Sequence, residues 1–246
     1  MAIFWYALVM TDGHIIIVIP TYNERENIKP LVSGINAVLP EAKILFVDDN
    51  SPDGTASVIK ELQRDNPDIL LIQREAKLGL GTAYIEAFRK ILQERLAEII
   101  VTMDGDLSHP IEAILPMVNL LNSNDLVIGS RYIKRGEIKN WPLHRKLLSY
   151  FANMYARSLI NIPFHDMTSG FMAIKASVLS EINLNQINSD GYAFLIELKY
   201  LISRIGNKIS EYPITFTERR LGKSKLSSKV ILEAVILPIK IFLRRL

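Results

Sequence analysis

Two aspartates separated by one glycine are the first residues in this chain that could carry out chemistry. Asp104 and Asp106 flank Gly105 directly after an apolar run at residues 99–103. Carboxylate oxygens are the ligands that hard divalent cations prefer, and a glycine between them lets a substrate approach the backbone. A cation held there could neutralise a diphosphate leaving group. The same pair also fits an ordinary polar turn, so its meaning depends on its surroundings.

A second acidic cluster follows another apolar run, at residues 44–47. Asp48 and Asp49 stand at the end of that run, where a carboxylate could bind a base or a ribose hydroxyl. The Asn, Ser and Asp residues at 50–53 are also of the types that cap helices. Both interpretations can hold within one loop.

The elements that must position these residues follow from alternating apolar and helical patterns. Apolar runs predict strands at residues 15–19, 44–47, 69–72, 99–103 and 126–128. Helices are predicted between them, the first capped by Asn27 with Pro30 in its first turn. This alternation predicts an α/β fold with a parallel sheet. Ligands of such sheets bind beyond the carboxyl ends of the strands, so the polar clusters are expected to converge on one crevice.

A Gly-x-Gly pattern precedes the predicted helix near residues 83–95. Gly79 and Gly81 could place backbone amides around a phosphate at the start of that helix. The same pattern serves simple turns, so both interpretations stay open.

Composition excludes several classes of chemistry. The chain has no cysteine, which excludes disulfides, zinc–thiolate sites and thiol catalysis and fits a reducing compartment. The formal net charge of +3 is too small to indicate a nucleic-acid binder, and no nucleic acid is expected as a partner. Basic residues gather near the C-terminus, which favours an anionic partner, either phosphate or a lipid surface. They are Arg219, Arg220, Lys223, Lys225, Lys229, Lys240, Arg244 and Arg245.

Several segments taken together resemble the GT-A family 2 glycosyltransferases. Pro20-Thr21-Tyr22-Asn23-Glu24, the Val-Asp-Asp segment at 47–55 and the Asp-Gly-Asp segment at 103–110 occur in that family's order and spacing. Later segments, at 129–132, 140–149, 166–171 and 211–226, resemble those of dolichol-phosphate (polyprenol-phosphate) mannose synthases. The resemblance implies a GT-A fold, a Rossmann-like and mostly parallel sheet flanked by helices.

The resemblance also implies a site. The guanosine portion of GDP-mannose would be bound by Pro20, Tyr22, Glu24, Val47 and Asp49. A Mg²⁺ or Mn²⁺ ion and the diphosphate would be held by Asp104, Gly105 and Asp106. Many relatives carry Gln where Ser108 stands, so Ser108, a water and His109 stay open as the third metal ligand. The acceptor phosphate would be gripped by Arg131, Arg145 and Ser149, which with Asp106 form the predicted catalytic set. Arg219 and Lys225 would close over the nucleotide diphosphate.

Alternatives remain for several of these residues. Arg131 and Arg145 could instead form surface salt bridges, the commoner fate of an arginine. Asp166 and Ser169 fit a capped turn as well as a role in ordering the site. Met172-Ala173 and Leu195 stand where many synthases carry Arg or Gln, which leaves the acceptor or sugar preference open.

The implied reaction is an inverting transfer of mannose from GDP-mannose to dolichyl or polyprenyl monophosphate, catalysed by a dolichyl-phosphate β-D-mannosyltransferase. A lipid monophosphate is already anionic at neutral pH, since its second ionisation has a pKa of about 6, and no general base is required. In-line attack on an α-linked donor gives polyprenyl-phosphate β-mannose and GDP.

The tail predicts contact with a membrane. Residues 1–225 are expected to form the catalytic domain, and 226–246 an amphipathic, membrane-proximal helix at the cytoplasmic face of a membrane. Packing of this helix on the catalytic domain is the alternative. Some relatives continue from here into transmembrane helices, so a truncated chain and a separate membrane-anchoring subunit both stay open.

Two other functions compete with this one. The first is a polyprenyl-phosphate glucosyltransferase, or another UDP-sugar transferase, on the same fold. The second, from a different class, is a non-catalytic lipid-phosphate-binding domain. Intact Asp104, Asp106, Arg131 and Lys225 argue against the second.

Overall fold

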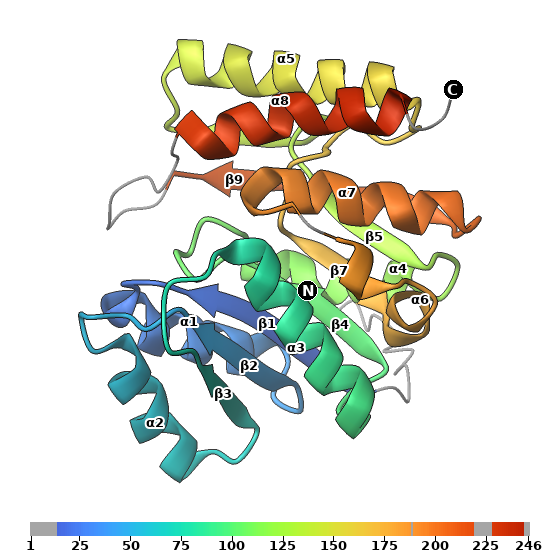
Figure 1. Ribbon diagram of the computed structural model, residues 1–246. Helices are drawn as coiled ribbons and strands as arrows, with labels where there is room; N and C mark the ends of the chain where they lie inside the picture. The colour runs from blue at the N-terminus through green and yellow to red at the C-terminus, as the bar shows by residue number, and fades with distance from the viewer. Residues whose placement is uncertain (1–13, 188, 219–227, 244–246) are drawn as a thin grey trace, which may run out of the picture.

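A seven-stranded sheet forms the centre of the fold (Figure 1). The structure, a computed structural model, describes residues 14–187, 189–218 and 228–243, and the side chains of the last helix from Val235 onward. The strands stand in the order β3-β2-β1-β4-β7-β5-β8. Their bounds are β1 Ile15–Thr21, β2 Lys43–Asp48, β3 Ile69–Gln73, β4 Ile99–Thr102, β5 Leu126–Ser130, β7 Met172–Lys175 and β8 Ile209–Pro213.

The sheet is parallel except around β7. That strand runs antiparallel to both of its neighbours, β4 and β5. All strands predicted from apolar runs are present, with small shifts at their ends. The expected α/β class with a mostly parallel sheet is confirmed, and β7 is the departure from a purely parallel arrangement.

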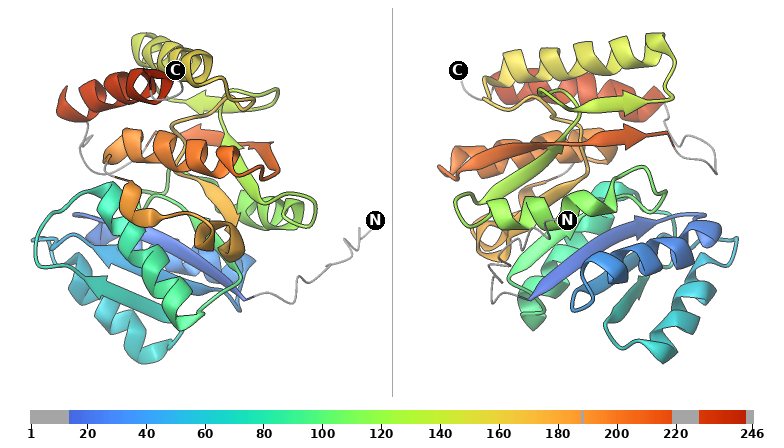
Figure 2. Two further views of the ribbon diagram at one scale, coloured as in Figure 1. Left: turned by 45° about the vertical axis from the view of Figure 1, so that its right-hand side comes forward. Right: turned by 180° about the vertical axis from the view of Figure 1, so that it is seen from behind.

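Helices cover both faces of the sheet (Figure 2). Alternate side chains of β1 point to opposite faces, so Ile16 and Val18 enter one core cluster and Ile17 and Ile19 the other. Because both faces are covered, each central strand is a continuous apolar run. One face packs against α1 Arg25–Val38, α2 Thr55–Asp65 and α4 Ile114–Leu120, which follows the 3-10 turn Ile111–Ala113. The other packs against α3 Leu80–Glu94, α6 Ala176–Ser180 and α7 Gly191–Arg204, with a 3-10 turn at Leu184–Gln186.

The start of α1 differs from the sequence prediction. Asn27 does not cap this helix: it lies inside it, and its amide donates to Glu24 Oε2 at 2.7 Å. The first N–H of the helix, that of Arg25, is instead bound by a residue in the loop before α2. Asp53 Oδ2 accepts it at 3.1 Å. Pro30 therefore lies beyond the first turn.

Asp53 serves two helices at once. Its Oδ1 accepts the N–H of Thr55, the first residue of α2, at 3.0 Å. Burial by itself raises the pKa of Asp53, but the hydrogen bonds from Thr55 and Arg25 outweigh burial and lower it. Asp53 thus supplies acceptors at the starts of α1 and α2, although the N-cap positions themselves are Glu24 and Gly54.

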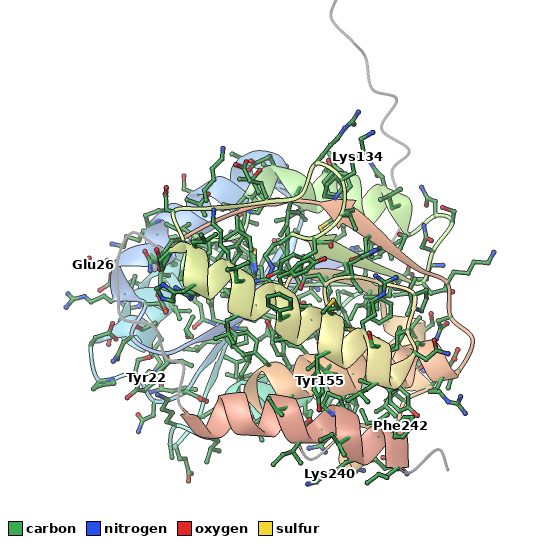
Figure 3. The ribbon with its side chains drawn as sticks, turned by 90° about the horizontal axis from the view of Figure 1, so that it is seen from above. Tyr22, Glu26, Lys134, Tyr155, Lys240 and Phe242 are labelled. Atoms are coloured by element: carbon green, nitrogen blue, oxygen red, sulfur yellow. The ribbon has the colours of Figure 1, made fainter. Side chains whose placement is uncertain are left out.

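Two helices form a further layer beyond α7. These are α5 Leu143–Ile160 and α8 Ser228–Leu243, which contact each other and lie side by side at the top of Figure 1. Next to them, β6 Glu137–Lys139 and β9 Thr215–Thr217 form a small parallel sheet. The Tyr155 hydroxyl of α5 donates to the Val235 carbonyl of α8 at 2.9 Å (Figure 3).

The helix predicted in the tail is present as α8, and it packs on the rest of the chain. Leu237 and Ile241 are buried, whereas Val235, Ile239 and Phe242 on the same helix are exposed. Within the described ranges, no helix combines the length and the apolar character that crossing a bilayer requires.

Candidate active site

The polar loops after β1, β2 and β4 meet in one cleft with a volume of about 410 Å³. This confirms that residues far apart in the sequence converge beyond the carboxyl ends of the strands. The loops that follow β3, β5 and α5 also contribute, together with residues of α3, α5, α7 and the short strand β9. The residues that line the cleft are Pro20, Thr21, Tyr22, Glu24, Asp49, Lys77, Gly79, Leu80, Ala83, Asp104, Gly105, Asp106, His109, Arg131, Trp141, Arg145, Thr168, Ser169, Gly170, Asp190, Gly191, Tyr192, Leu195 and Phe216.

Asp49 is held in place from two sides. Its Oδ1 accepts a hydrogen bond from Arg74 Nη1 at 2.5 Å, and its Oδ2 accepts the Gly79 N–H at 3.0 Å. Arg74 also donates to Thr82 Oγ1 at 2.6 Å, and its side chain is buried. A buried carboxylate with these partners is fixed in its direction.

A cation and an aromatic ring lie together at the same end of the cleft. Lys77 Nζ lies 3.9 Å from the centroid of the Tyr22 ring, within range of a cation–π contact. Tyr22 follows β1 and Lys77 follows β3, so the two loops approach each other here. Their flat aromatic face and positive charge are suited to a base and a phosphate.

The backbone amides of the Gly-x-Gly turn are already in use. The Gly79 N–H binds Asp49, and the Gly81 N–H donates to Asp190 Oδ1 at 2.7 Å. Gly79 has a φ of 100°, and an added Cβ would lie 2.1 Å from Asp190 Oδ2. The glycines are therefore required by the turn and by the close approach of Asp190, and the phosphate-cradle alternative is contradicted for these two amides.

Asp104 and Asp106 reach the cleft from the turn after β4. The Asp104 side chain is 40% exposed, whereas Asp106 is largely buried. Asp106 Oδ1 accepts the Ser108 N–H at 3.1 Å, which steadies the turn. The Asp104 carboxylate is therefore the more open of the two.

His109 holds this turn in place through a hydrogen bond to its backbone. Its Nδ1 accepts the main-chain N–H of Asp104 at 3.0 Å, so in the neutral ring the proton resides on Nε2. Nε2 lies 3.8 Å from Asp104 Oδ2, and the ring stacks on Phe171 at a centroid distance of 4.9 Å. With Nδ1 occupied and Nε2 protonated, His109 has no lone pair to offer a metal.

The donors in this turn fit a hard divalent cation. Two carboxylates line one cleft, and oxygen donors suit Mg²⁺ and Mn²⁺. Among the described residues there is no cluster of three His, Asp or Glu side chains that could hold a metal. A cation here would complete its shell with substrate oxygens and water, as Mg²⁺ usually does. Ser108 does not line the cleft, and its Oγ is buried without a hydrogen-bond partner in the described part of the chain.

Arg131 reaches the cleft as one half of a buried ion pair. Its Nε and Nη2 each donate to a different oxygen of Asp166 at 2.7 Å, and Nη2 also donates to Thr168 Oγ1 at 2.9 Å. Burial alone lowers the pKa of Arg131, but the Asp166 carboxylate outweighs it and raises this pKa. Burial likewise raises the pKa of Asp166, and Arg131 brings it below its ordinary value. Arg131 is thus no surface salt bridge, and Asp166 orders it from beneath.

Arg145 is held more loosely than Arg131. Its guanidinium lies 3.9 Å from the Trp141 ring centroid and donates to Glu218 Oε1 at 2.7 Å. Its side chain is 24% exposed, so the pair with Glu218 is open to solvent. Arg145 can therefore exchange this partner for a ligand at low cost.

Most of the predicted site residues come together, but not all of them. Those that line the cleft are Pro20, Tyr22, Glu24, Asp49, Asp104, Gly105, Asp106, Arg131 and Arg145. Val47 is buried in the core beneath it. Ser149 lies outside the lining and accepts a hydrogen bond from the Tyr132 hydroxyl at 2.7 Å. Arg219 and Lys225 lie outside the described residues.

Sequence reasoning missed several residues in the cleft. Lys77 precedes the Gly-x-Gly turn, and its place in the loop after the third strand could have signalled it. Thr168 lies within a segment matched to relatives, but nothing singled it out there. Asp190 and Tyr192 enter only because the start of α7 folds back onto the turn before α3, and no local pattern indicates that.

Comparison with known proteins gives a consistent answer. Residues 16–182 match the Glycosyl transferase family 2 model. A polyprenol monophosphomannose synthase from Mycolicibacterium smegmatis is 41% identical over 93% of this chain and 87% of its own length. An undecaprenyl-phosphate mannosyltransferase from Micrococcus luteus is 39% identical over 90% of this chain and 91% of its own.

Solved structures share the fold at low sequence identity. Glucosyl-3-phosphoglycerate synthase from Mycobacterium tuberculosis, in complex with Mn²⁺, UDP and phosphoglyceric acid, aligns with a TM-score of 0.64 at 19% identity, over 94% of this chain and 78% of that one. A mannosyltransferase from Pyrobaculum calidifontis, in complex with GDP-Man and Mn²⁺, aligns with a TM-score of 0.56 at 16% identity, over 94% and 72%. The expected GT-A fold is confirmed.

Proposed function

The chain belongs to glycosyl transferase family 2, and from that membership we propose that it transfers mannose from GDP-mannose to a polyprenyl monophosphate. The observation that carries this proposal is the content of one cleft. It holds a pair of carboxylates, Asp104 and Asp106, together with two arginines, Arg131 and Arg145. A nucleotide diphosphate needs the first pair, through a cation, and an acceptor phosphate needs the second. The relatives named for this reaction support the choice of substrates.

The donor would bind across the ends of β1, β2 and β4. Tyr22 and Lys77 offer a stacking face and a positive charge, and Asp49 offers a fixed carboxylate for a hydroxyl or a base. A divalent cation held by Asp104 and Asp106 would stabilise the negative charge that develops on the departing diphosphate. The fixed positions of these groups limit reorganisation during the reaction.

The acceptor needs orientation rather than deprotonation. A phosphate monoester has a second pKa of about 6, so its oxygen is already a nucleophile at neutral pH. Arg131 is rigid because Asp166 grips it, and Arg145 can release Glu218 in favour of a phosphate oxygen. The Arg145 guanidinium, once it leaves Glu218, can hold two phosphate oxygens at once, and the bonds to Asp166 and Thr168 leave Nη1 of Arg131 to donate to the same phosphate. Together they would align a phosphate oxygen with the sugar C1. The product of this single displacement is β-linked.

A parallel assay of donors tests the proposal. The protein is incubated with Mg²⁺ or Mn²⁺, a short polyprenyl phosphate and labelled GDP-mannose, UDP-glucose or UDP-GlcNAc. Turnover with GDP-mannose is expected. Turnover with a UDP-sugar alone would contradict the mannose assignment, and no turnover with any donor would favour a binding domain.

We also propose that α5 and α8 place the protein on a membrane surface. Exposed apolar side chains recur at helical spacing on α5 and continue on α8, and together they make up a lipid-facing surface. They are Leu143, Leu147, Leu148, Phe151 and Met154 on α5 and Val235, Ile236, Ile239, Phe242 and Leu243 on α8. Arg145 belongs to α5, so the same helix would meet both the bilayer and the lipid phosphate. An apolar face with basic residues nearby is typical of interfacial helices.

A further inference from the structure

A buried lysine stands directly behind the wall of the cleft. Lys199 on α7 is fully buried, which is rare for an amine unless it has specific partners. Its Nζ donates to the main-chain carbonyls of Met167 at 2.9 Å and Ser169 at 2.7 Å. These two carbonyls lie on either side of Thr168, so one amine fixes both ends of a short turn.

That turn, residues 166–170, connects the side of the cleft at Arg131, assigned to the acceptor, with the side at Asp104, assigned to the donor. Asp166 grips Arg131, and Thr168 Oγ1 accepts a further hydrogen bond from the same guanidinium. At the other end, Gly170 lies against the Asp104 carboxylate, since a Cβ added there would sit 3.4 Å from Asp104 Oδ1. The position of the turn therefore sets the distance between Arg131 and the donor side.

Other side chains also hold this turn, and Asn153 reaches its centre at Thr168 as well as Met167. Asn153 Oδ1 accepts the Met167 N–H at 2.7 Å, and Ser169 Oγ donates to the Gly129 carbonyl at 2.6 Å. Lys199 binds two carbonyls of the turn with one group, which neither Asn153 nor Ser169 does. Removing the amine would leave both carbonyls buried without that donor, and they would be expected to shift toward other partners.

From this geometry we infer that Lys199 is a positioning residue for the acceptor phosphate: it fixes the turn at residues 166–170 and thereby the direction of Arg131. Lys199 does not touch the substrate. The inference rests on the proposed function, because Arg131 is assigned to the acceptor there. It predicts a selective defect, in which acceptor binding weakens far more than donor binding, because Asp49 and Lys77 hold the donor side from other loops.

The test compares Lys199→Met with the wild type and with Lys175→Met. Methionine keeps the apolar stem and removes both donated hydrogen bonds, whereas Lys175 pairs with Asp125 on the surface and serves as the matched control. We expect Lys199→Met to raise the KM for a short polyprenyl phosphate by roughly 10-fold, equivalent to the loss of about one hydrogen bond. The KM for GDP-mannose and the values for Lys175→Met should stay within about twofold.

Calorimetric titration with farnesyl phosphate separates this inference from the proposed function. Weaker binding to Lys199→Met than to the wild type supports the inference even if no donor is turned over. Equal acceptor affinity and equal KM in the two proteins would overturn it while leaving the proposed function intact.

A second variant keeps the inference testable if Lys199→Met does not fold. Lys199→Gln retains a shorter donor that can reach one carbonyl, and it should show an intermediate acceptor KM. Equal loss of donor and acceptor affinity in a folded variant would assign Lys199 to stability alone and overturn the inference, and so would failure of both variants to fold.

Discussion

Arg131 and Arg145 show two ways in which a folded chain presents an arginine to an anion. Arg131 is fixed by a buried bidentate pair with Asp166, and Arg145 is stacked on Trp141 with a solvent-exposed partner. The first arrangement supplies direction, and the second allows exchange of one carboxylate for a phosphate. Sequence patterns identify both arginines but reveal neither arrangement, because their partners lie 35 and 73 residues away.

Asp166 is the site residue whose substitution should most reduce the stability of the protein. Asp166→Asn keeps the shape of the side chain but leaves Arg131 buried without a counter-charge. Breaking a buried pair in this way costs about 3–5 kcal/mol, so urea denaturation should show a loss of that size in the free energy of unfolding.

The matched control for that variant is Asp125→Asn. Asp125 pairs with Lys175, but both side chains are partly exposed. Its loss should cost below about 1 kcal/mol. Equal losses in the two variants would show that burial of the Arg131 pair has no special weight.

Asp106 is one of the two carboxylates proposed to bind the divalent cation. Asp106→Ala should lower kcat/KM by roughly 100-fold or more, since even groups that merely support a metal ligand are worth about 10- to 100-fold. Initial rates measured over a Mn²⁺ titration check this, with the exposed Asp65→Ala as control. An unchanged rate in Asp106→Ala would remove the metal assignment.

At the scale of elements, α7 carries a buried amine, Lys199, whose protonation makes the stability of the protein depend on pH. Burial lowers the pKa of Lys199 from 10.5 to about 7, the Asp166 and Glu211 carboxylates oppose that fall, and Arg131 adds to it. Between about pH 7 and 10.5 the unfolded chain therefore binds a proton that the folded chain does not. The contribution of Lys199 to the free energy of unfolding is therefore lowest below about pH 7, where the folded amine is charged. This contribution rises as the pH increases from about 7 to 10.5.

The measurement is the free energy of unfolding of wild type and Lys199→Met at several pH values. The wild type should gain stability relative to the variant as pH rises from 7 toward 9.5, well inside that window. Two curves that stay parallel would mean that Lys199 keeps its ordinary protonation in the folded protein.

The sequence predicts elements where the signal is local and fails where it is tertiary. The β1, β2 and β4 runs are buried on both faces, so each is a continuous apolar stretch that needs no partner to be recognised. β7 is short and antiparallel, and only its pairing with β4 and β5 reveals it. The start of α1 was misplaced because its acceptor, Asp53, comes from another loop.

The same distinction applies to the site. Carboxylates at strand ends are visible in the sequence because parallel strands bring their carboxyl ends together. The engagement of Asp49 by Arg74, and of Gly81 by Asp190, depends on loops that meet only in the fold. A hydrogen bond between residues 109 positions apart, as in the second case, leaves no periodic signal.

At the scale of the whole molecule, the layer formed by α5 and α8 should meet lipid. The double variant Leu148→Glu, Phe151→Glu places two charges on the exposed apolar face of α5. Each apolar side chain buried is worth about 1.5–3 kcal/mol, so partitioning onto anionic vesicles should fall by at least roughly 10-fold. Co-flotation with phosphatidylglycerol-containing vesicles measures this.

Leu78→Glu is the matched control for the vesicle experiment. Leu78 is 57% exposed but lies in the loop between β3 and α3, outside the lipid-facing surface. It should float like the wild type. If the double variant also floats like the wild type, α5 does not form the contact.

The product of a single turnover tests the central claim most directly. The protein is given GDP-[¹³C]mannose, a divalent cation and farnesyl phosphate, and the one-bond carbon–hydrogen coupling at the anomeric centre is read by NMR. A single displacement by the acceptor phosphate predicts β-mannosyl phosphate and GDP in equal amounts. An α-linked product, or free mannose with the acceptor unchanged, would contradict the account.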